Sequence, residues 1–372
     1  MGIAFKYAAN SAITLQIFFN IKRYFSVETF FSSEKTSLMT FKKNLSAVCI
    51  NVFIPVIVFS QTGIADSNKI INIDTNRYNL SSQKKEQQYR LYADGIYIYK
   101  KPKPFSFLTK SPNDAAGMIS TAFNKNNRKQ LLIITSSTIV LLFADQVIVD
   151  AVKQFSKKIN LDPTEKNKIL VSIKSGNKET TLLKVPQNLN TALYQLGQGM
   201  PGLLIASGLC IFGKINHDYR ALSTANQLAE SFILMGAATQ LLKRITGRET
   251  PGEATVPGGR WRFFPSIKNF QNNTPRYDAF PSGHIATLIS SVTILAGNYP
   301  EKKWILPIGY SLSGLVAFSM INNNVHWISD YPLAIGLGYL CAKQLIKRNR
   351  GKLSYTLNYT SGILQPGIIY KF

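Results

Sequence analysis

The histidines are the most informative side chains for chemistry, because the chain has only three among 372 residues. Two of them stand beside other reactive groups: His284 ends a Pro-Ser-Gly-His tetrapeptide, and His326 precedes Asp330 by four residues. On a helix beginning near 326, side chains at this spacing share a face. The carboxylate would then accept a hydrogen bond from one imidazole nitrogen and leave the other nitrogen available as a nucleophile.

The residues around His284 suit the binding of an anion. Ser282 is a good helix N-cap, and the backbone amides of Gly283 and His284 would point out of the positive end of that helix. Such an end binds phosphate well. Upstream, Lys243 ends an apolar stretch and would add a positive charge. Each feature alone also has an ordinary structural explanation, so the chemistry depends on their combination.

Taken in order, these residues resemble the type 2 phosphatidic acid phosphatase and vanadium haloperoxidase superfamily over about residues 129–348. Members of that superfamily have a Lys followed seven and eight residues later by Arg-Pro, then Pro-Ser-Gly-His. A Ser-Arg pair follows, with His after five intervening residues and Asp four residues further on. The positions that match in type and spacing are Lys243, Pro251, residues 281–284, Ser319, His326 and Asp330.

The resemblance implies a role for each matched residue. His326 would attack phosphorus to form a phosphohistidine, Asp330 would orient it, and His284 would protonate the leaving oxygen. The phosphate would be held, without a metal or another cofactor, by Lys243, Ser282 and Gly283.

Two departures from the family pattern concern the arginines that grip the phosphate. The chain has Thr250 before the matching Pro251, and Met320 after the matching Ser319. One preorganised hydrogen-bond donor is commonly worth about 2.7 to 4 kcal/mol of transition-state stabilisation. We therefore expect arginines from neighbouring positions to replace the two that are missing. The candidates are Arg244, Arg248, Arg260 and Arg262.

These features predict a phosphatase that acts on a phosphate monoester or diphosphate, with a lipid as the expected carrier. The missing arginines leave two alternatives open. The first is a catalytically silent relative that binds a lipid phosphate or protein partners. The second is a vanadate-dependent haloperoxidase, which this sequence disfavours because such a site uses several cations to hold vanadate.

Six apolar stretches predict the helices that would position these residues, namely 130–149, 200–212, 222–245, 282–296, 304–321 and 326–345. Together with the resemblance, they predict an all-α, six-helix bundle of the phosphatase and haloperoxidase type. After Arg350 the apolar residues alternate with polar ones, which predicts a small C-terminal β-hairpin.

We divide the chain into four regions: an N-terminal extension with a signal-like apolar segment (1–60), a polar lead-in (61–128), the helical core (129–348) and the C-terminal hairpin (349–372). The signal-like segment has a basic start and an apolar run that is short for a membrane span of about 20 residues. We expect cleavage near Gln61. The lead-in should contain a strand at 91–99. The Lys-rich insertion at 154–195 should form a small hairpin.

The composition narrows the class of protein. With 43 Lys and Arg against 19 Asp and Glu, the formal net charge is +24. The basic residues are scattered through connecting segments, so we expect anionic lipids rather than nucleic acid as partners. The 45% share of apolar residues excludes intrinsic disorder. The three cysteines, Cys49, Cys210 and Cys341, lie in apolar runs without the spacing of a metal site or a disulfide framework.

The basic residues that flank the apolar stretches favour a membrane protein whose site faces the periplasm or the exterior. A cleaved signal conflicts with this arrangement, because the first helix would then enter the membrane from the wrong side. An exported, soluble periplasmic bundle is therefore the alternative location.

Overall fold

The structure, a computed structural model, describes residues 86–92, 95–175, 178–360 and 363–371. The signal-like segment, Cys49 and the expected cleavage near Gln61 lie outside these ranges. Within them the chain is mostly helical, with eleven α-helices and two small antiparallel sheets. The predicted all-α class with six helices is therefore too simple, although its helical character is confirmed.

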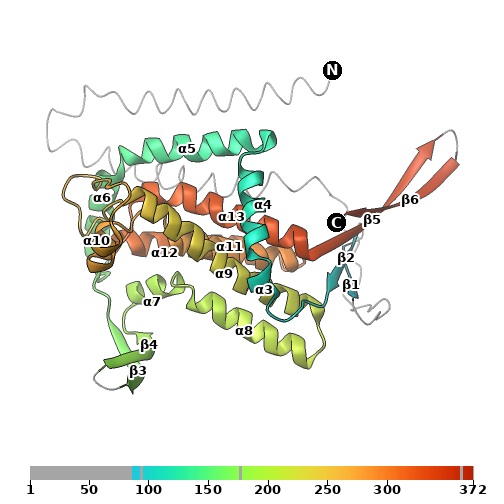
Figure 1. Ribbon diagram of the computed structural model, residues 1–372, viewed down its shortest axis with the longest axis horizontal. Coiled ribbons are helices and arrows are strands. Elements are labelled where there is room, and N and C mark those ends of the chain that lie inside the picture. The colour runs from blue at the N-terminus through green and yellow to red at the C-terminus, as the bar shows by residue number, and fades with distance from the viewer. Residues whose placement is uncertain (1–85, 93–94, 176–177, 361–362, 372) are drawn as a thin grey trace. The chain divides into compact units, whose positions relative to one another are not determined.

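Four helices form the centre of the fold (Figure 1): α9 (Tyr219–Thr246), α11 (Gly283–Asn298), α12 (Ile305–Asn322) and α13 (Tyr331–Asn349). Helix α11 contacts each of the other three, and α13 also contacts α9. A further helix, α8 (Met200–Ile215), packs against α9. The stretches predicted for α8, α9, α11 and α12 are helical within a few residues of their expected bounds.

The contact between α11 and α13 depends on a close approach of the two backbones. Ile285, Ile289 and Val292 recur at helical spacing on α11 and are buried. A Cβ atom added at Gly338 of α13 would lie 2.3 Å from the carbonyl oxygen of Ala286. Glycine at 338 therefore allows the two helices to pack more closely than any other residue would.

The first predicted helix, 130–149, is in fact two helices. They are α5 (Arg128–Leu142) and α6 (Asp145–Lys158), which meet at an angle of 69°. The break brings the fully buried Asp145 against Ser329, whose backbone N–H and hydroxyl both donate to its carboxylate at 3.0 and 2.6 Å. A buried carboxylate needs such partners, and the apolar pattern of the sequence does not reveal them.

The last predicted helix, 326–345, begins later than expected. Trp327 has an extended backbone, a 3₁₀ turn η4 (Ile328–Asp330) follows, and α13 begins only at Tyr331. Pro332 lies in the first turn of α13, where the N–H that proline lacks would have no helical partner. His326 and Asp330 therefore do not share one α-helix, which corrects the prediction.

Four short helices complete the helical part: α3 (Ser106–Thr109) and α4 (Ser111–Ala122) in the lead-in, α7 (Leu189–Leu196) at the end of the insertion, and α10 (Ile267–Asn272). Helix α4 contacts α9 and α13, whereas α7 contacts α8 and α12. The lead-in and the insertion thus pack directly on the core helices.

One sheet has four antiparallel strands in the order β1-β2-β5-β6 (Figure 1). They are β1 (Glu86–Tyr92), β2 (Gly95–Lys100), β5 (Arg350–Thr360) and β6 (Ile363–Lys371). The predicted C-terminal hairpin is confirmed as β5 and β6, but the strand expected at 91–99 is part of a second hairpin, β1 and β2. Because β2 pairs with β5, residues from the lead-in and from the C-terminal region share one sheet.

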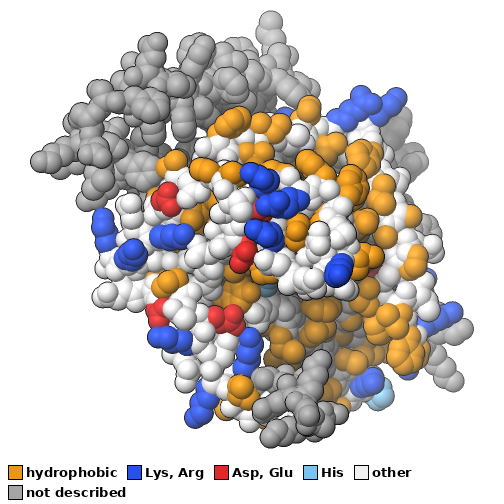
Figure 2. Space-filling view, turned by 60° about the vertical axis from the view of Figure 1, so that its left-hand side comes forward, with side chains coloured by type: hydrophobic (Ala, Val, Ile, Leu, Met, Phe, Trp, Pro, Cys, Tyr) orange, Lys and Arg blue, Asp and Glu red, His pale blue; other side chains and the backbone are white. Residues whose placement is uncertain are grey.

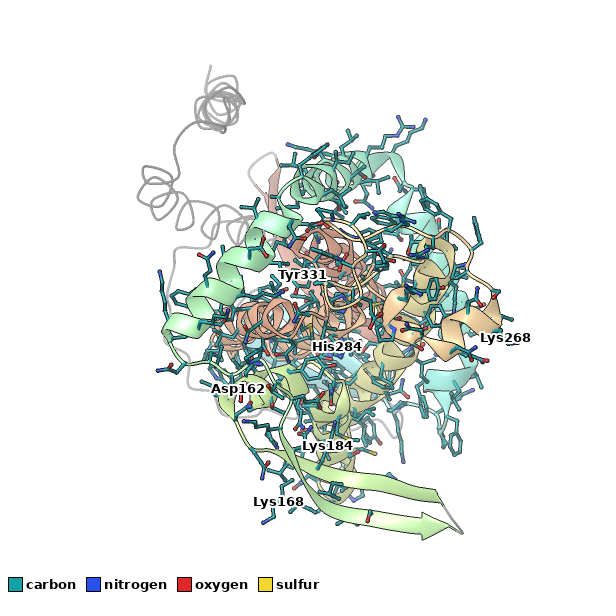
Figure 3. All side chains as sticks on the ribbon, turned by 90° about the vertical axis from the view of Figure 1, so that its left-hand side faces the viewer. Asp162, Lys168, Lys184, Lys268, His284 and Tyr331 are labelled. Carbon is teal, nitrogen blue, oxygen red and sulfur yellow. The ribbon has the colours of Figure 1, made fainter. Side chains whose placement is uncertain are left out.

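The insertion carries the second sheet, which consists of β3 (Asn167–Ser175) and β4 (Lys178–Pro186). This confirms the hairpin expected from the sequence. Its base joins the core through contacts between β4 and α7. Figure 3 shows Lys168 and Lys184 on this hairpin, away from His284 among the helices.

Several helices expose apolar side chains, and hydrophobic areas are visible on the surface in Figure 2. On α8, for example, Leu204, Ile211 and Ile215 are 64%, 60% and 72% exposed. Among the described residues, α12 is long and apolar enough to cross a membrane, and the number rises to as many as three if each bent helix pair forms one span. The bent pairs join α5 (extended back to Lys125) to α6, and α7 to α8.

Candidate active site

His326 and Asp330 pair with each other although they do not share a helix. His326 Nδ1 lies 3.3 Å from Asp330 Oδ2, across the extended Trp327 and the turn η4. The same carboxylate oxygen accepts the backbone N–H of Trp327 at 2.8 Å. The carboxylate therefore holds the Nδ1 side of the His326 ring, and the ring also interacts with the backbone of Ala279.

His284 lies in the first turn of α11, and its ring is close to that of His326. The centroids of the His284 and His326 rings are 6.0 Å apart. Ser282 is the N-cap of α11, as the sequence predicts, and its hydroxyl accepts the N–H of Ile285 at 3.4 Å. The two imidazoles, 42 residues apart in the chain, thus lie at the start of α11 and just before α13.

Lys243 supplies a positive charge from the last turn of α9. Its side chain is almost fully buried, and its Nζ atom lies 3.0 Å from Asp278 Oδ2. Gly283 lies near the same helix, because a Cβ added there would be 3.2 Å from Thr239 Oγ1. The structure therefore brings Lys243, Ser282 and Gly283 to the same region as the histidines. The sequence had not indicated Asp278 as the partner of Lys243.

The imidazole of His326 is held in the neutral form. Burial and the nearby charge of Lys243 lower the pKa of His326 to about 3. A neutral imidazole can act as a nucleophile.

Asp330 has the opposite shift. Burial raises the pKa of its carboxyl to about 6, and the guanidinium of Arg248 limits this rise. The carboxylate is therefore ionised at neutral pH and can accept the hydrogen bond from His326. It would lose this ability as the pH falls through about 6.

The positions of the two missing arginines carry no charge. Met320 is fully buried, with its Sδ atom 4.0 Å from Ser282 Oγ, and its side chain packs beside Gly197, which follows α7. Thr250 is nearly buried and donates its backbone N–H to Pro275 O at 3.1 Å. Neither side chain can replace a guanidinium.

The four candidate replacement arginines have different surroundings. Arg244 lies over the ring of Phe270, with Cζ 3.8 Å from the ring centroid. Arg262 bonds Glu249, with Nη2 and Oε1 2.5 Å apart. The side chain of Arg260 is exposed. Among these four, only Arg248 makes a hydrogen bond to the His326–Asp330 pair.

Arg248 is fully buried and bonds carboxylates on two sides. Its Nη1 donates to Asp330 Oδ1 at 2.6 Å and to Ser329 Oγ at 2.7 Å. Its Nη2 donates to Asp145 Oδ2 at 2.5 Å and to Gly258 O at 2.7 Å. Arg248 thus contacts Asp330 on the side away from His326. No sequence pattern had indicated Asp145 as its second partner.

Helix α7 covers the site on another side. The centroids of the Tyr194 and His284 rings are 5.5 Å apart. Ser319, the matched motif serine, donates its hydroxyl to Asn190 O of α7 at 2.8 Å. His326 is consequently only 1% exposed. Within the described ranges, no group of three His, Cys, Asp or Glu side chains is arranged to hold a metal ion.

Comparison with known proteins agrees with the motifs. Residues 224–352 match the PAP2 superfamily. This match to part of the chain confirms the resemblance seen in the sequence. Lys243, His284, His326 and Asp330 all lie inside the matched residues, whereas Asp145 lies outside them.

Two similar proteins give further context. Over 64 residues the chain is 33% identical to the lipid A 1-phosphatase of Porphyromonas gingivalis. The aligned region covers 17% of this chain and 14% of that protein. The second is a transmembrane PAP2-type phosphatidylglycerolphosphate phosphatase from Bacillus subtilis, known from a crystal structure. It is 16% identical, with a TM-score of 0.31, over 65% of this chain and 94% of that chain.

Proposed function

We propose that the protein is a phosphatase that removes phosphate from a phosphate monoester or diphosphate of a lipid, through a phosphohistidine formed on His326. One observation carries the proposal: the His326–Asp330 pair faces His284 with 6.0 Å between the two ring centroids. A phosphoryl group between the rings would meet a nucleophile on one side and a proton donor on the other. The similarity to a lipid A 1-phosphatase supports a lipid substrate.

The reaction has two steps. In the first, His326 Nε2 forms a bond to phosphorus as the bond to the leaving oxygen breaks, and His284 gives its ring proton to that oxygen. In the second, His284 takes a proton from a water molecule whose oxygen attacks phosphorus, and the P–N bond breaks to release inorganic phosphate. Asp330 keeps the proton on Nδ1 throughout, so that the lone pair of Nε2 remains available.

The phosphate oxygens would be held by Lys243, by the N-terminal amides of α11 near Gly283, and by Ser282. Phosphoryl transfer depends mainly on positioning and on charge that stabilises the equatorial oxygens. With Thr250 and Met320 in place of arginines, the site retains fewer cations, so we expect slower turnover than a site with both guanidinium groups would give.

We propose that the site faces the exported side of a membrane. His284 and Asp330 lie at the N-terminal ends of α11 and α13, whereas Lys302 and Lys347 lie at or beyond the opposite ends. Helices of these lengths span about 24 to 28 Å. The positions of Lys302 and Lys347 agree with the tendency of Lys and Arg to remain on the cytoplasmic side.

Two exposed positions test this orientation. Glu253 lies in the loop on the side of the imidazoles, and Lys302 follows α11 at the far end. In intact cells, a membrane-impermeant maleimide should label Glu253→Cys but not Lys302→Cys, and both should react after the cells are opened. Equal labelling in intact cells would exclude the proposed orientation.

The alternative function is a silent relative that binds a lipid phosphate without turnover. Thr250, Met320 and the burial of His326 favour it. Phosphate release separates the two functions. We would measure it for the solubilised full chain with phosphatidic acid, phosphatidylglycerol phosphate, a polyprenyl diphosphate and lipid A. Turnover by the wild type should disappear in His326→Asn.

The matched control is His217→Asn, because His217 is an exposed histidine with φ 51°, a conformation that asparagine also tolerates. This variant should keep full activity. Absence of phosphate release from every substrate, with retained binding of the lipids, would favour the silent relative.

A further inference from the structure

The contacts of Arg248 form a buried network behind the catalytic pair. One guanidinium bridges Asp145 and Asp330, and the hydroxyl of Ser329 both accepts from Arg248 at 2.7 Å and donates to Asp145 at 2.6 Å. All four residues of the network are fully buried, namely Asp145, Arg248, Ser329 and Asp330. They come from α6, from the residues after α9, and from the turn η4.

The network fixes Asp330 from the side that His326 does not use. Asp330 Oδ1 accepts a hydrogen bond from Arg248 Nη1. Asp330 Oδ2 accepts a hydrogen bond from the backbone N–H of Trp327 and lies opposite His326 Nδ1. Both oxygens therefore have partners, and the carboxylate has little freedom to rotate. Such outer contacts hold a catalytic ring in one orientation and one tautomer.

The charges in the network also matter for the reaction. Two carboxylates share one guanidinium, so the three groups together carry one negative charge when both acids are ionised. His326 gains positive charge as it attacks phosphorus, and this uncompensated negative charge would stabilise it.

We propose that Arg248 and Asp145 are positioning residues for the reaction, which act through Asp330 on His326, and that Arg248 is not one of the groups that hold the phosphate. This inference rests on the proposed phosphatase function. It also assigns a role to α6, which lies outside the residues that match the PAP2 superfamily.

The two residues should affect the pH profile in opposite directions. The titratable and charged groups around Asp330 are Arg248, Asp145, Lys243, the neutral His326 and Tyr331. Arg248 lowers the pKa of Asp330, and the charge of Asp330 raises the pKa of Asp145. Because repulsion between two carboxylates is mutual, the charge of Asp145 should also favour the protonated form of Asp330. Loss of the guanidinium should therefore raise the pKa of Asp330, and loss of the Asp145 charge should lower it.

The test compares kcat, KM and the acidic limb of the kcat profile for Arg248→Lys and Asp145→Asn. A lysine cannot bridge both carboxylates. We expect kcat to fall about 10²-fold in each variant, as for a reacting group displaced by about 1 Å. KM should stay within about twofold of the wild type, because uniform binding of the substrate is unchanged.

The acidic limb should move to higher pH in Arg248→Lys and to lower pH in Asp145→Asn. A rise in KM with unchanged kcat in Arg248→Lys would instead mean that Arg248 binds phosphate, and would overturn the inference. Unchanged kcat and unchanged acidic limbs in both variants would overturn it as well.

Two further variants keep the test decisive if a buried substitution impairs folding. Ser329→Ala removes one hydroxyl from the network without changing its charge, and kcat should fall with the acidic limb in place. Arg220→Lys disrupts another buried arginine, which bonds Glu301 and Asn298 O at 2.7 and 2.6 Å. It should lower the melting temperature without altering the pH profile of the folded protein.

His326→Asn separates this inference from the proposed function. If His326→Asn retains turnover, the phosphohistidine proposal fails. If His326→Asn is inactive while Arg248→Lys, Asp145→Asn and Ser329→Ala behave like the wild type, only the positioning network fails.

Discussion

Near each end of α13 an arginine lies between two buried carboxylates, but the two clusters have different neighbours. At the N-terminal end, Arg248 joins Asp145 to Asp330, and Asp330 continues to His326. Arg248 and Asp145 are 103 residues apart in the chain. This cluster therefore connects distant segments and also ends on a reactive ring.

At the C-terminal end, Arg348 forms two hydrogen bonds to Glu230 of α9, at 2.9 and 2.5 Å, and an ion pair with Asp114 of α4. Gln344 adds a bond to Asp114 at 3.3 Å. The cluster ties α4 and α9 to α13. These bonds of Arg348 to Glu230 and Asp114 attach helices to one another, and neither acid is bonded to a histidine in the described part of the chain.

The comparison of the two clusters shows that an arginine between two buried acids does not by itself mark an active site. Both clusters contain two buried acids, although the side chain of Arg248 is fully buried and that of Arg348 is 20% exposed. The functional difference lies in the next contact, which is His326 at one end and a neighbouring helix at the other. Substitutions at the two clusters should therefore separate activity from stability.

The largest expected effect is on activity at the N-terminal end. His326→Asn removes the nucleophile but keeps a side chain that can still bond Asp330, so the melting temperature should change little. Turnover should fall by about 10⁴- to 10⁶-fold, as when a catalytic unit loses its central residue. The measurement is single-turnover phosphate release together with thermal unfolding. A fall of less than tenfold would place the chemistry elsewhere.

The C-terminal cluster should give the reverse result. Arg348→Met leaves the buried acids Glu230 and Asp114 without their cation. Because the arginine side chain is 20% exposed, the loss should stay at or below about 3 kcal/mol, the lower end of the cost of breaking a buried ion pair. Unfolding by denaturant should show this loss, whereas kcat per folded molecule should match the wild type. A large fall in kcat at full folding would show that the two ends are not independent.

A third prediction concerns the position of a missing arginine. Met320→Arg would bury a cation near Ser282, and without a partner this should destabilise the protein by about 3 kcal/mol. A bound anion should reverse the effect, because a ligand at about 100 times its Kd adds about 2.7 kcal/mol. The check is the melting temperature of both proteins with and without vanadate or phosphate. If the anion shifts both equally, Met320 does not face the phosphate position.

The sequence predicted what short-range patterns determine. Ser282 caps α11, the insertion and the C-terminus form hairpins, and five of the six apolar stretches are mainly single helices. The pairing of His326 with Asp330 was also expected, although the 3₁₀ turn rather than an α-helix produces it. Four-residue spacing allowed the contact in either geometry.

The sequence could not predict the contacts that depend on tertiary packing. Apolar residues continue across the break between α5 and α6, so periodicity indicated one helix where there are two. Asp145 interrupted this run without any local partner, because its partners Arg248 and Ser329 lie 103 and 184 residues away. The four candidate arginines were likewise chosen by their closeness in the chain, which does not indicate where a guanidinium points.

The smallest expected effect lies between the two clusters, where α13 packs on α11. A Cβ in Gly338→Ala would meet the carbonyl oxygen of Ala286 at 2.3 Å, and overpacking of this kind costs about 1 to 3 kcal/mol. The matched control is Gly208→Ala on α8, where a Cβ would meet nothing within 4 Å.

In Gly208→Ala the better helix propensity of alanine should add stability, by up to about 1 kcal/mol. Denaturant unfolding of the two variants gives the sign of each effect. If α13 moves as a rigid rod, Gly338→Ala should also lower kcat, because Asp330 directly precedes the helix. Lower stability with unchanged kcat would mean instead that the network around Arg248 holds Asp330 in place independently of how closely α13 packs against α11.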